Sequence, residues 1–178
     1  MVQAPNRAQW KVRLLVTPLE ALIGRVIQRE GGVADVGDGK GVTRYGQTPE
    51  WLTQFNLAAP RSVQEAAANY LRWIDLVGFR PLVDAGDDLA DILLDIAVMS
   101  SAPKAVKALQ AALNVRVDGV LGRETLQALA LTGRRRLAFL VIAWDMEYQG
   151  KVITLNPQRA MYAGGWAARM AAHVRDLA

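Results

Sequence analysis

Residues 17–32 read TPLEALIGRVIQREGG, and this stretch predicts where a helix starts, which face it buries and where it ends. Thr17 followed by Pro18 is typical of a helix start, because threonine caps the first turn and proline fits the first helical position. Apolar residues then recur at helical spacing, at Leu19, Leu22, Ile23, Val26 and Ile27. The two glycines at the end of the stretch end the predicted helix.

Glu30 lies on the apolar face of this predicted helix, in its last turn. It follows Leu19, Ile23 and Ile27 at spacings that place all four side chains on one side of a helix. Apolar neighbours and the negative end of the helix dipole both disfavour the ionised form of a carboxyl. A carboxyl that keeps its proton suits a general acid for glycosidic cleavage, so Glu30 is the first candidate catalytic residue. The alternative is a structural carboxylate that reaches solvent or pairs with a basic residue.

Residues 33–49 are rich in glycine and aspartate, which predicts a long loop or a short β-hairpin after the first helix. A loop of this length in a compact domain is usually functional. A carboxylate hydrolase needs an acid, a base and a group that places water, and Asp35, Asp38 and Thr43 are available to complement Glu30. The alternative for the two aspartates is turn formation.

The composition limits the chemistry open to this chain. Its 178 residues, 52% hydrophobic and 21% charged, indicate a globular chain with the length of one domain. It has no cysteine and one histidine, His173, which excludes thiol nucleophiles and thiolate metal sites. Hydrolysis by carboxylates needs neither residue. The loop after the first helix also lacks the ligand spacing of a calcium-binding EF-hand, so we expect no metal and no cofactor.

Helical periodicity continues along the chain, so the predicted fold is mainly α. Further helices are expected at residues 49–57, 62–77, 88–99, 103–113, 123–131, 134–149 and 164–177. Ser62 and Glu65 have capping-box spacing. The apolar face of that helix is expected to hold Val63, Ala67, Tyr70, Leu71, Ile74 and Val77. We expect an N-terminal arm at 1–17, a catalytic region at 18–100, and a second helical region at 101–178 packed into the same compact unit.

Positive charge gathers in the second half of the chain. Residues 90–178 contain 11 basic and 7 acidic residues, whereas residues 1–89 contain ten of each. Such a distribution favours a polyanionic partner, such as nucleic acid, anionic lipid or anionic cell-wall polymer, with a solvated helix face as the alternative. No helix-turn-helix or basic-aromatic pattern accompanies the charge, so nucleic acid is not the expected partner.

Two motifs carry a resemblance to a known family. The first is Arg29-Glu30-Gly31-Gly32, and the second is GVTRYGQT at residues 41–48. Together they resemble glycoside hydrolase family 108, phage and prophage endolysins with N-acetylmuramidase (lysozyme) activity. The resemblance implies a lysozyme-like helical domain, with the Gly/Asp-rich active-site loop after the first helix and Glu30 as catalytic acid. By motif it implies that Thr43 orders the loop or the attacking water, and it favours Asp38 as the second carboxylate.

Two later segments are similar to the same family. LQAALNVRVDGVLGRETL, at residues 109–126, resembles the predicted peptidoglycan-binding segment of these enzymes, with purely structural packing as the alternative. Its Asp118-Gly119 pair is expected to form a turn that Val120 and Leu121 pin to the core. Near the end, Gly165-Trp166-x-x-Arg169 resembles the closing motif, so Trp166 is expected either to stack on a sugar or to pack in the core.

The chain also departs from the family pattern. The family Asp-Pro-Gly-Gly stretch becomes DGKG at residues 38–41, in a loop one residue shorter, and the Ile after Tyr-Gly becomes Gln47. Residues 95–101 (DIAVMSS) lack the Asn and Gly of a family segment. These departures keep two alternatives to a muramidase open: a catalytically weak peptidoglycan-binding or particle-associated protein, and a lytic transglycosylase.

The function implied by the resemblance is cleavage of the β-1,4 bond between N-acetylmuramic acid and N-acetylglucosamine, for bacterial lysis by a phage or phage-like particle. Substrate contacts are expected from Asp35, Tyr45, Gly46 and Trp166. Residues 1–16 lack the apolar run of a secretory signal, so we expect synthesis in the host cytoplasm, with a holin supplying passage to periplasmic peptidoglycan. A monomer is expected.

Overall fold

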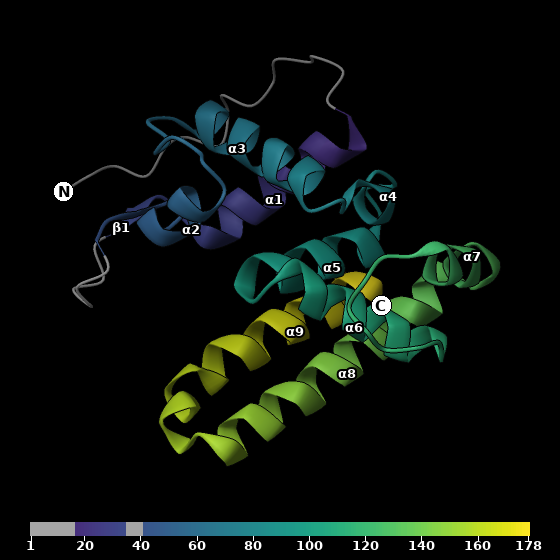
Figure 1. The fold of residues 1–178 in the computed structure, drawn as a ribbon. Coiled ribbons are helices and arrows are strands. Elements are labelled where there is room, and N and C mark those ends of the chain that lie inside the picture. Colours follow the sequence, from purple (N-terminus) through teal and green to yellow (C-terminus); the bar gives the residue numbers. More distant parts are fainter. Residues whose placement is uncertain (1–16, 35–40) are drawn as a thin grey trace.

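The computed structural model describes residues 17–34 and 41–178 and shows a mainly helical protein with one small sheet, which confirms the predicted fold class (Figure 1). The expected arm at 1–17, except for residue 17, lies outside these ranges, as do Asp35 and Asp38. None of the helices in the described ranges has the length and apolarity to cross a membrane.

The first helix, α1, spans Pro18–Glu30 and has the predicted ends and buried face. The Thr17 side chain accepts a hydrogen bond from Glu20 N (3.2 Å), and the Glu20 carboxylate accepts one from Thr17 N (2.8 Å), which completes a capping box. Gly31 follows with a φ of 80°, a conformation that glycine adopts without a Cβ clash. The buried residues are the predicted ones: Leu19, Leu22, Ile23, Val26 and Ile27.

A two-stranded antiparallel sheet follows α1, which confirms the predicted short hairpin. Strand β1 (Val33–Ala34) pairs with β2 (Thr43–Arg44), so that Val33 lies opposite Arg44 and Ala34 opposite Thr43. Tyr45 N donates a hydrogen bond to Gly32 O (2.9 Å), and this bond ties the end of β2 to the end of α1.

The remaining helices follow the predicted order. They are α2 (Pro49–Gln54), α3 (Val63–Leu76), α5 (Asp88–Met99), α6 (Ala102–Leu113), α7 (Arg123–Leu131), α8 (Arg134–Leu155) and α9 (Ala163–Leu177). The sequence did not predict the short helix α4 (Arg80–Val83) or the 3-10 helix η2 (Pro157–Tyr162), which are too short to show a periodic pattern. The sequence analysis also predicted that α8 ends at residue 149. A glycine and β-branched residues follow that position and lower the helix propensity there.

Helix α3 packs its predicted apolar face on the core, but two of its most deeply buried residues, Ala66 and Trp73, were not predicted. Its buried residues are Ala66, Tyr70, Trp73 and Ile74, whereas Val63, Ala67, Leu71 and Val77 are only partly buried. Aromatic packing accounts for the burial of Trp73, since Trp51 of α2 lies 5.7 Å, centroid to centroid, from both Tyr70 and Trp73. Ser62 caps the helix, but the Glu65 carboxylate binds Arg61 N (2.8 Å), so only half of the predicted capping box forms.

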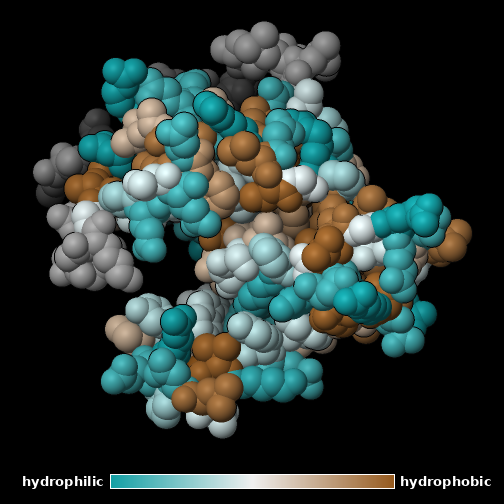
Figure 2. Space-filling model, in the orientation of Figure 1, coloured by the Kyte–Doolittle hydropathy of each residue, from teal (hydrophilic) through white to brown (hydrophobic). Residues whose placement is uncertain are grey.

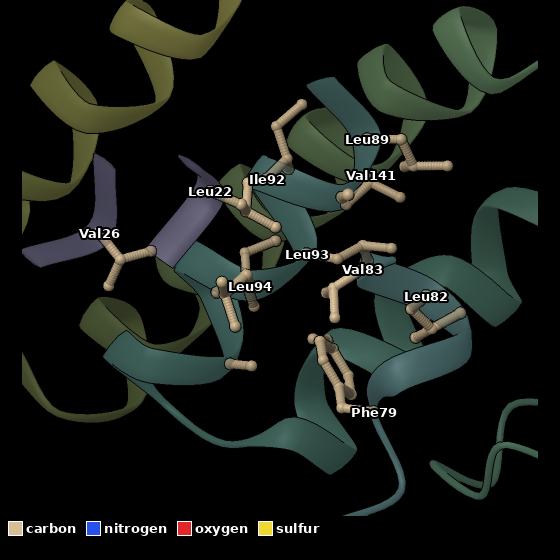
Figure 3. Close-up of a cluster of buried hydrophobic side chains, with 14 of the residues drawn as sticks. Leu22, Val26, Phe79, Leu82, Val83, Leu89, Ile92, Leu93, Leu94 and Val141 are labelled. Atoms are coloured by element: carbon tan, nitrogen blue, oxygen red, sulfur yellow. The ribbon is translucent and has the colours of Figure 1, made fainter. Parts of the chain in front are cut away.

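Helix α5 lies at the centre of the fold, with Leu89–Ala97 buried throughout. It packs against α1, α4, α6, α8 and α9. Figure 3 shows its side chains meeting apolar side chains of neighbouring helices, among them Leu22, Val83 and Val141. The division of the chain near residue 100 stays a prediction, and α5 and α6, on either side of it, pack together.

Asp91, on the buried helix α5, joins that helix to α1. It is 7% exposed, and its carboxylate accepts hydrogen bonds from Arg25 Nε (3.0 Å) and Arg29 Nη1 (3.1 Å). Burial alone would raise the pKa of Asp91, but the hydrogen bonds and charges of the two arginines outweigh burial and hold the pKa below its ordinary value.

Replacing Asp91 with Asn is expected to lower the free energy of unfolding at neutral pH by about 1–3 kcal/mol, because it removes the nearly buried carboxylate charge that Arg25 and Arg29 share. The pKa of Asp91 in the folded state lies below its unfolded value of about 3.9. The contribution of Asp91 is therefore present above about pH 4 and is lost as the pH falls through the folded-state pKa. Urea unfolding of both proteins at neutral and acidic pH measures the difference.

The control variant is Glu147→Gln, which breaks an exposed pair with Lys151 (4.0 Å) and should change stability by less than about 1 kcal/mol. An Asp91→Asn penalty that is as large at acidic pH as at neutral pH would contradict the assignment.

Candidate functional site

Glu30 lies at the C-terminal end of α1, with its side chain 20% exposed. Its Oε1 accepts a hydrogen bond of 2.7 Å from Nη1 of Arg169 on α9, 139 residues away in the chain. The structure therefore shows the alternative in which Glu30 pairs with a basic residue, and not a purely apolar setting. The sequence pattern of α1 could not show this, because the partner comes from the other end of the chain.

Arg169 is shared between Glu30 and Asp95 of α5. Its Nη1 lies 3.2 Å from Asp95 Oδ1, and Asp95 has no exposed surface. His173 Nε2, one turn further along α9, lies 3.0 Å from Asp95 Oδ2, and Arg29 Nε lies 3.2 Å from Oδ1. A fully buried carboxylate is costly unless it is paired. These partners therefore hold Asp95, which in turn holds Arg169 against Glu30.

We call Glu30, Arg169, Asp95 and His173 the central charge cluster. Sequence reasoning named each of these residues but did not bring them together. It treated Asp95 as part of a diverged motif, His173 as a lone histidine and Arg169 as part of a closing motif. The available signal was an aspartate inside the apolar run of α5, because such a residue requires a polar partner.

The turn after β2 packs directly against Glu30. A Cβ built on Gly46 (φ 79°) would lie 2.7 Å from Glu30 Cγ and 2.8 Å from the Tyr70 hydroxyl, so only glycine fits there. The Tyr70 hydroxyl donates a hydrogen bond to Tyr45 O (2.9 Å). Burial and then the neighbouring Glu30 charge raise the pKa of Tyr70, so the hydroxyl keeps its proton.

Gln47, where the family pattern has isoleucine, anchors the same turn to α3. It is fully buried, its Nε2 donates to Ala66 O (2.9 Å), and its Oε1 accepts from Asn69 Nδ2 (2.8 Å). These hydrogen bonds hold the turn in its place beside Glu30.

The other predicted site residues differ in how closely they approach Glu30. Gly46 is in contact with it, Tyr45 packs partly against the core, and Thr43 is half-buried in β2, two residues before Tyr45. Asp35 and Asp38 lie outside the described residues, so the second carboxylate stays a prediction. In residues 17–34 and 41–178, no group of three or more Asp, Glu or His side chains is placed to hold a metal ion.

A cavity of about 520 Å³ opens between the α5–α6 junction and the arm formed by α8, η2 and α9. Trp166 lines it, one helical turn before Arg169. Trp166 is half-buried, stacks on Tyr162 (centroids 5.9 Å apart, 29° between planes) and lies outside the hydrophobic core of the described residues. Figure 2 shows the surface hollowed beside this arm. Trp166 therefore does not pack in the core, and its contact with a sugar stays a prediction.

Gln110 of α6 organises the loop of the peptidoglycan-binding-like segment. Its buried Oε1 accepts hydrogen bonds from Asp118 N (3.0 Å) and Gly119 N (2.8 Å), and its Nε2 donates to Asp118 Oδ1 (2.8 Å) and Val120 O (3.0 Å). The predicted turn at Asp118-Gly119 is present. The prediction that Val120 pins it is wrong, because Val120 is 65% exposed; Leu121 packs on the core and Gln110 holds the backbone.

Comparison with known proteins adds a family match and a likeness to solved structures. Residues 101–129 match the family described as "Putative peptidoglycan binding domain". Among solved structures, that of SagA from Brucella abortus matches with a TM-score of 0.69 and 22% identity, over 89% of this chain and 92% of that chain. A search of curated protein sequences finds no significant match. The family match supports a peptidoglycan-related function with peptidoglycan as a partner, and the structural likeness shows the fold.

Replacing Gly46 with Ala is expected to lower the free energy of unfolding by about 1–3 kcal/mol, because the new Cβ clashes with Glu30 and Tyr70 and the positive φ adds strain. Gly31→Ala is the matched control, since Gly31 has a similar φ of 80° but a Cβ there meets nothing within 4 Å. Urea unfolding of the two variants measures the difference. Equal stability of the two variants would show that the turn does not press on Glu30.

Proposed function

We propose that this protein is a peptidoglycan hydrolase, an N-acetylmuramidase that cleaves the β-1,4 bond between N-acetylmuramic acid and N-acetylglucosamine. The observation that carries the proposal is the setting of Glu30, a partly exposed carboxyl at the end of helix α1, between the hairpin turn and Arg169. The family match at residues 101–129 supports peptidoglycan as the substrate class.

Glu30 would act as the general acid that protonates the glycosidic oxygen. Arg169 would stabilise the carboxylate that forms when the proton leaves, since its guanidinium already contacts Oε1. Because Arg169 also contacts the buried Asp95, it would stay oriented while Glu30 changes charge. The central charge cluster thus supplies a fixed cation at the point where negative charge develops.

The proposed second half of the reaction is attack by water on the opposite face of the sugar. Thr43 would place the water and Asp38 would activate it, with Asp35 as the alternative second carboxylate. Support comes from the motif that contains Thr43 and from the position of β2, whose following turn contacts Glu30. An inverting enzyme requires about 6.5–9.5 Å between its carboxyl groups, and a retaining enzyme about 5–5.5 Å.

Two alternative functions each have an observation in their favour. In a lytic transglycosylase a single acid suffices, and Glu30 is a carboxyl that packs against the hairpin turn. In a catalytically weak wall-binding or particle-associated protein, the Glu30–Arg169 pair would serve structure alone. On the resemblance, we further propose a role in lysis by a phage or phage-like particle, with a holin providing access to periplasmic peptidoglycan.

Digestion of purified peptidoglycan tests the muramidase proposal. The parent protein is expected to release fragments with reducing-end N-acetylmuramic acid, and Glu30→Gln to slow that release by about 100-fold or more, the usual effect of losing a general acid. Mass spectrometry of the soluble fragments identifies the ends. Glu50→Gln, an exposed glutamate in the first turn of α2, is the control and should cleave at the parent rate.

Other outcomes separate the alternatives. Anhydro sugar ends would establish a transglycosylase in place of a muramidase. If neither the parent nor Glu30→Gln releases fragments while both sediment with the wall, the enzyme proposal fails and a binding protein remains.

A further inference from the structure

The cavity beside the α8–η2–α9 arm, here called the arm cavity, has walls from two parts of the chain. The α5–α6 junction contributes Ser100, Ser101 and Lys104. The arm contributes Tyr148, Arg159 and Trp166. The cavity therefore offers hydroxyl groups, aromatic rings and cations to a ligand.

The arm cavity lies next to two features described above. These are the pair formed by Glu30 and Arg169, and the segment that matches the peptidoglycan-binding family. Trp166 precedes Arg169 by one turn of α9, and Arg169 contacts Glu30. On the opposite wall, Ser101 and Lys104 fall within residues 101–129, which match the peptidoglycan-binding family. A glycan strand that ran from Glu30 toward the matched segment would cross this cavity.

The two cations of the arm cavity differ in what they already bind. Lys104 Nζ lies 2.7 Å from the buried Asp145 Oδ1 and 3.2 Å from Ser100 Oγ, and it sits 4.4 Å from the centroid of the Tyr148 ring. Its charge is therefore already compensated inside the protein. Arg159 is exposed and makes no ion pair within the described part of the chain.

The residues near Arg159 in the sequence keep the electrostatic potential on the arm side of the cavity positive. Residues 148–175 contain no aspartate or glutamate, so no acidic side chain of η2 or α9 in this span offsets Arg159. A cation in such a setting favours an anionic ligand group, and a guanidinium suits a carboxylate because it can donate two parallel hydrogen bonds. The neighbouring Trp166 offers a flat apolar face to the same ligand.

We propose that the arm cavity binds a peptide-bearing sugar of the glycan strand, with Trp166 against the sugar ring and Arg159 on a carboxylate of the attached peptide. Peptidoglycan presents both groups together, because its muramic acid units carry short peptides with free carboxylates. The inference rests on the proposed function in taking peptidoglycan as the substrate, and it adds recognition of the peptide as well as the sugar.

Titration of the full chain tests the inference without any cleavage. The Glu30→Gln protein is titrated calorimetrically with two probes, an N-acetylglucosamine–N-acetylmuramic acid disaccharide carrying its peptide and the same disaccharide without it. In the peptide-free probe the lactyl carboxyl of the muramic acid, to which the peptide is otherwise attached, is capped as a methyl amide, so that only the peptide-bearing probe has a carboxylate. The peptide-bearing probe is expected to bind about tenfold more tightly, the effect of one charge-assisted hydrogen-bonding contact. Arg159→Gln should abolish that preference, and Trp166→Ala should weaken binding of both probes.

Arg175→Gln is the matched control. It removes an exposed arginine from the last turn of α9 and should keep the preference for the peptide-bearing probe. Thermal unfolding of each variant checks that the fold is intact. Equal binding of the two probes by the Glu30→Gln protein, or a preference that survives Arg159→Gln, overturns the inference.

The two proposals fail in different ways. If peptidoglycan is cleaved in a Glu30-dependent manner but the peptide preference is absent, the muramidase proposal holds and the inference about the arm cavity falls. If the Arg159-dependent preference is present but nothing is cleaved, the cavity is a peptidoglycan site in a protein that does not hydrolyse the strand.

Discussion

Asp95 sits on the most buried helix of the fold with no surface exposed to water. An isolated charge in that position would be strongly unfavourable, so the surrounding helices must supply partners. Arg29 comes from the end of α1, and Arg169 and His173 come from one face of α9. The first and last described helices are thereby fixed against the central one, and the carboxyl of Glu30 is fixed with them.

The fixed position of Glu30 also explains why so few residue types fit in the hairpin turn beside it. Once Arg169 fixes the Glu30 side chain, the chain that passes beside it has room for a glycine at position 46 and for little else. Tyr70 and Gln47 then hold the turn from α3 through hydrogen bonds. The candidate site is therefore assembled from four separated elements, and each of them is positioned by contacts that do not depend on a bound ligand.

Local signals predicted the helices well, because caps, glycines and apolar spacing act over a few residues. Both ends of α1 and the hairpin after it follow from such signals, and so does the choice of Glu30 as a candidate. The partners of Glu30 and Asp95 could not be predicted, since they depend on how distant helices pack. The burial of Trp73 on α3 was missed for a similar reason, because its contact with Trp51 is tertiary.

The packing also changes how the basic C-terminal third should be understood. Arg134 binds Asp87, Arg135 binds the Leu177 carbonyl, and Arg169 binds Glu30 and Asp95. These three arginines are held by contacts inside the fold, so fewer of the basic side chains in this third can meet a polymer than the sequence alone suggests. Arg159 differs from them, because it is exposed and lines a cavity. In the proposed function, attraction to an anionic wall would therefore depend on exposed cations such as Arg159, which lies in the arm beside aromatic side chains.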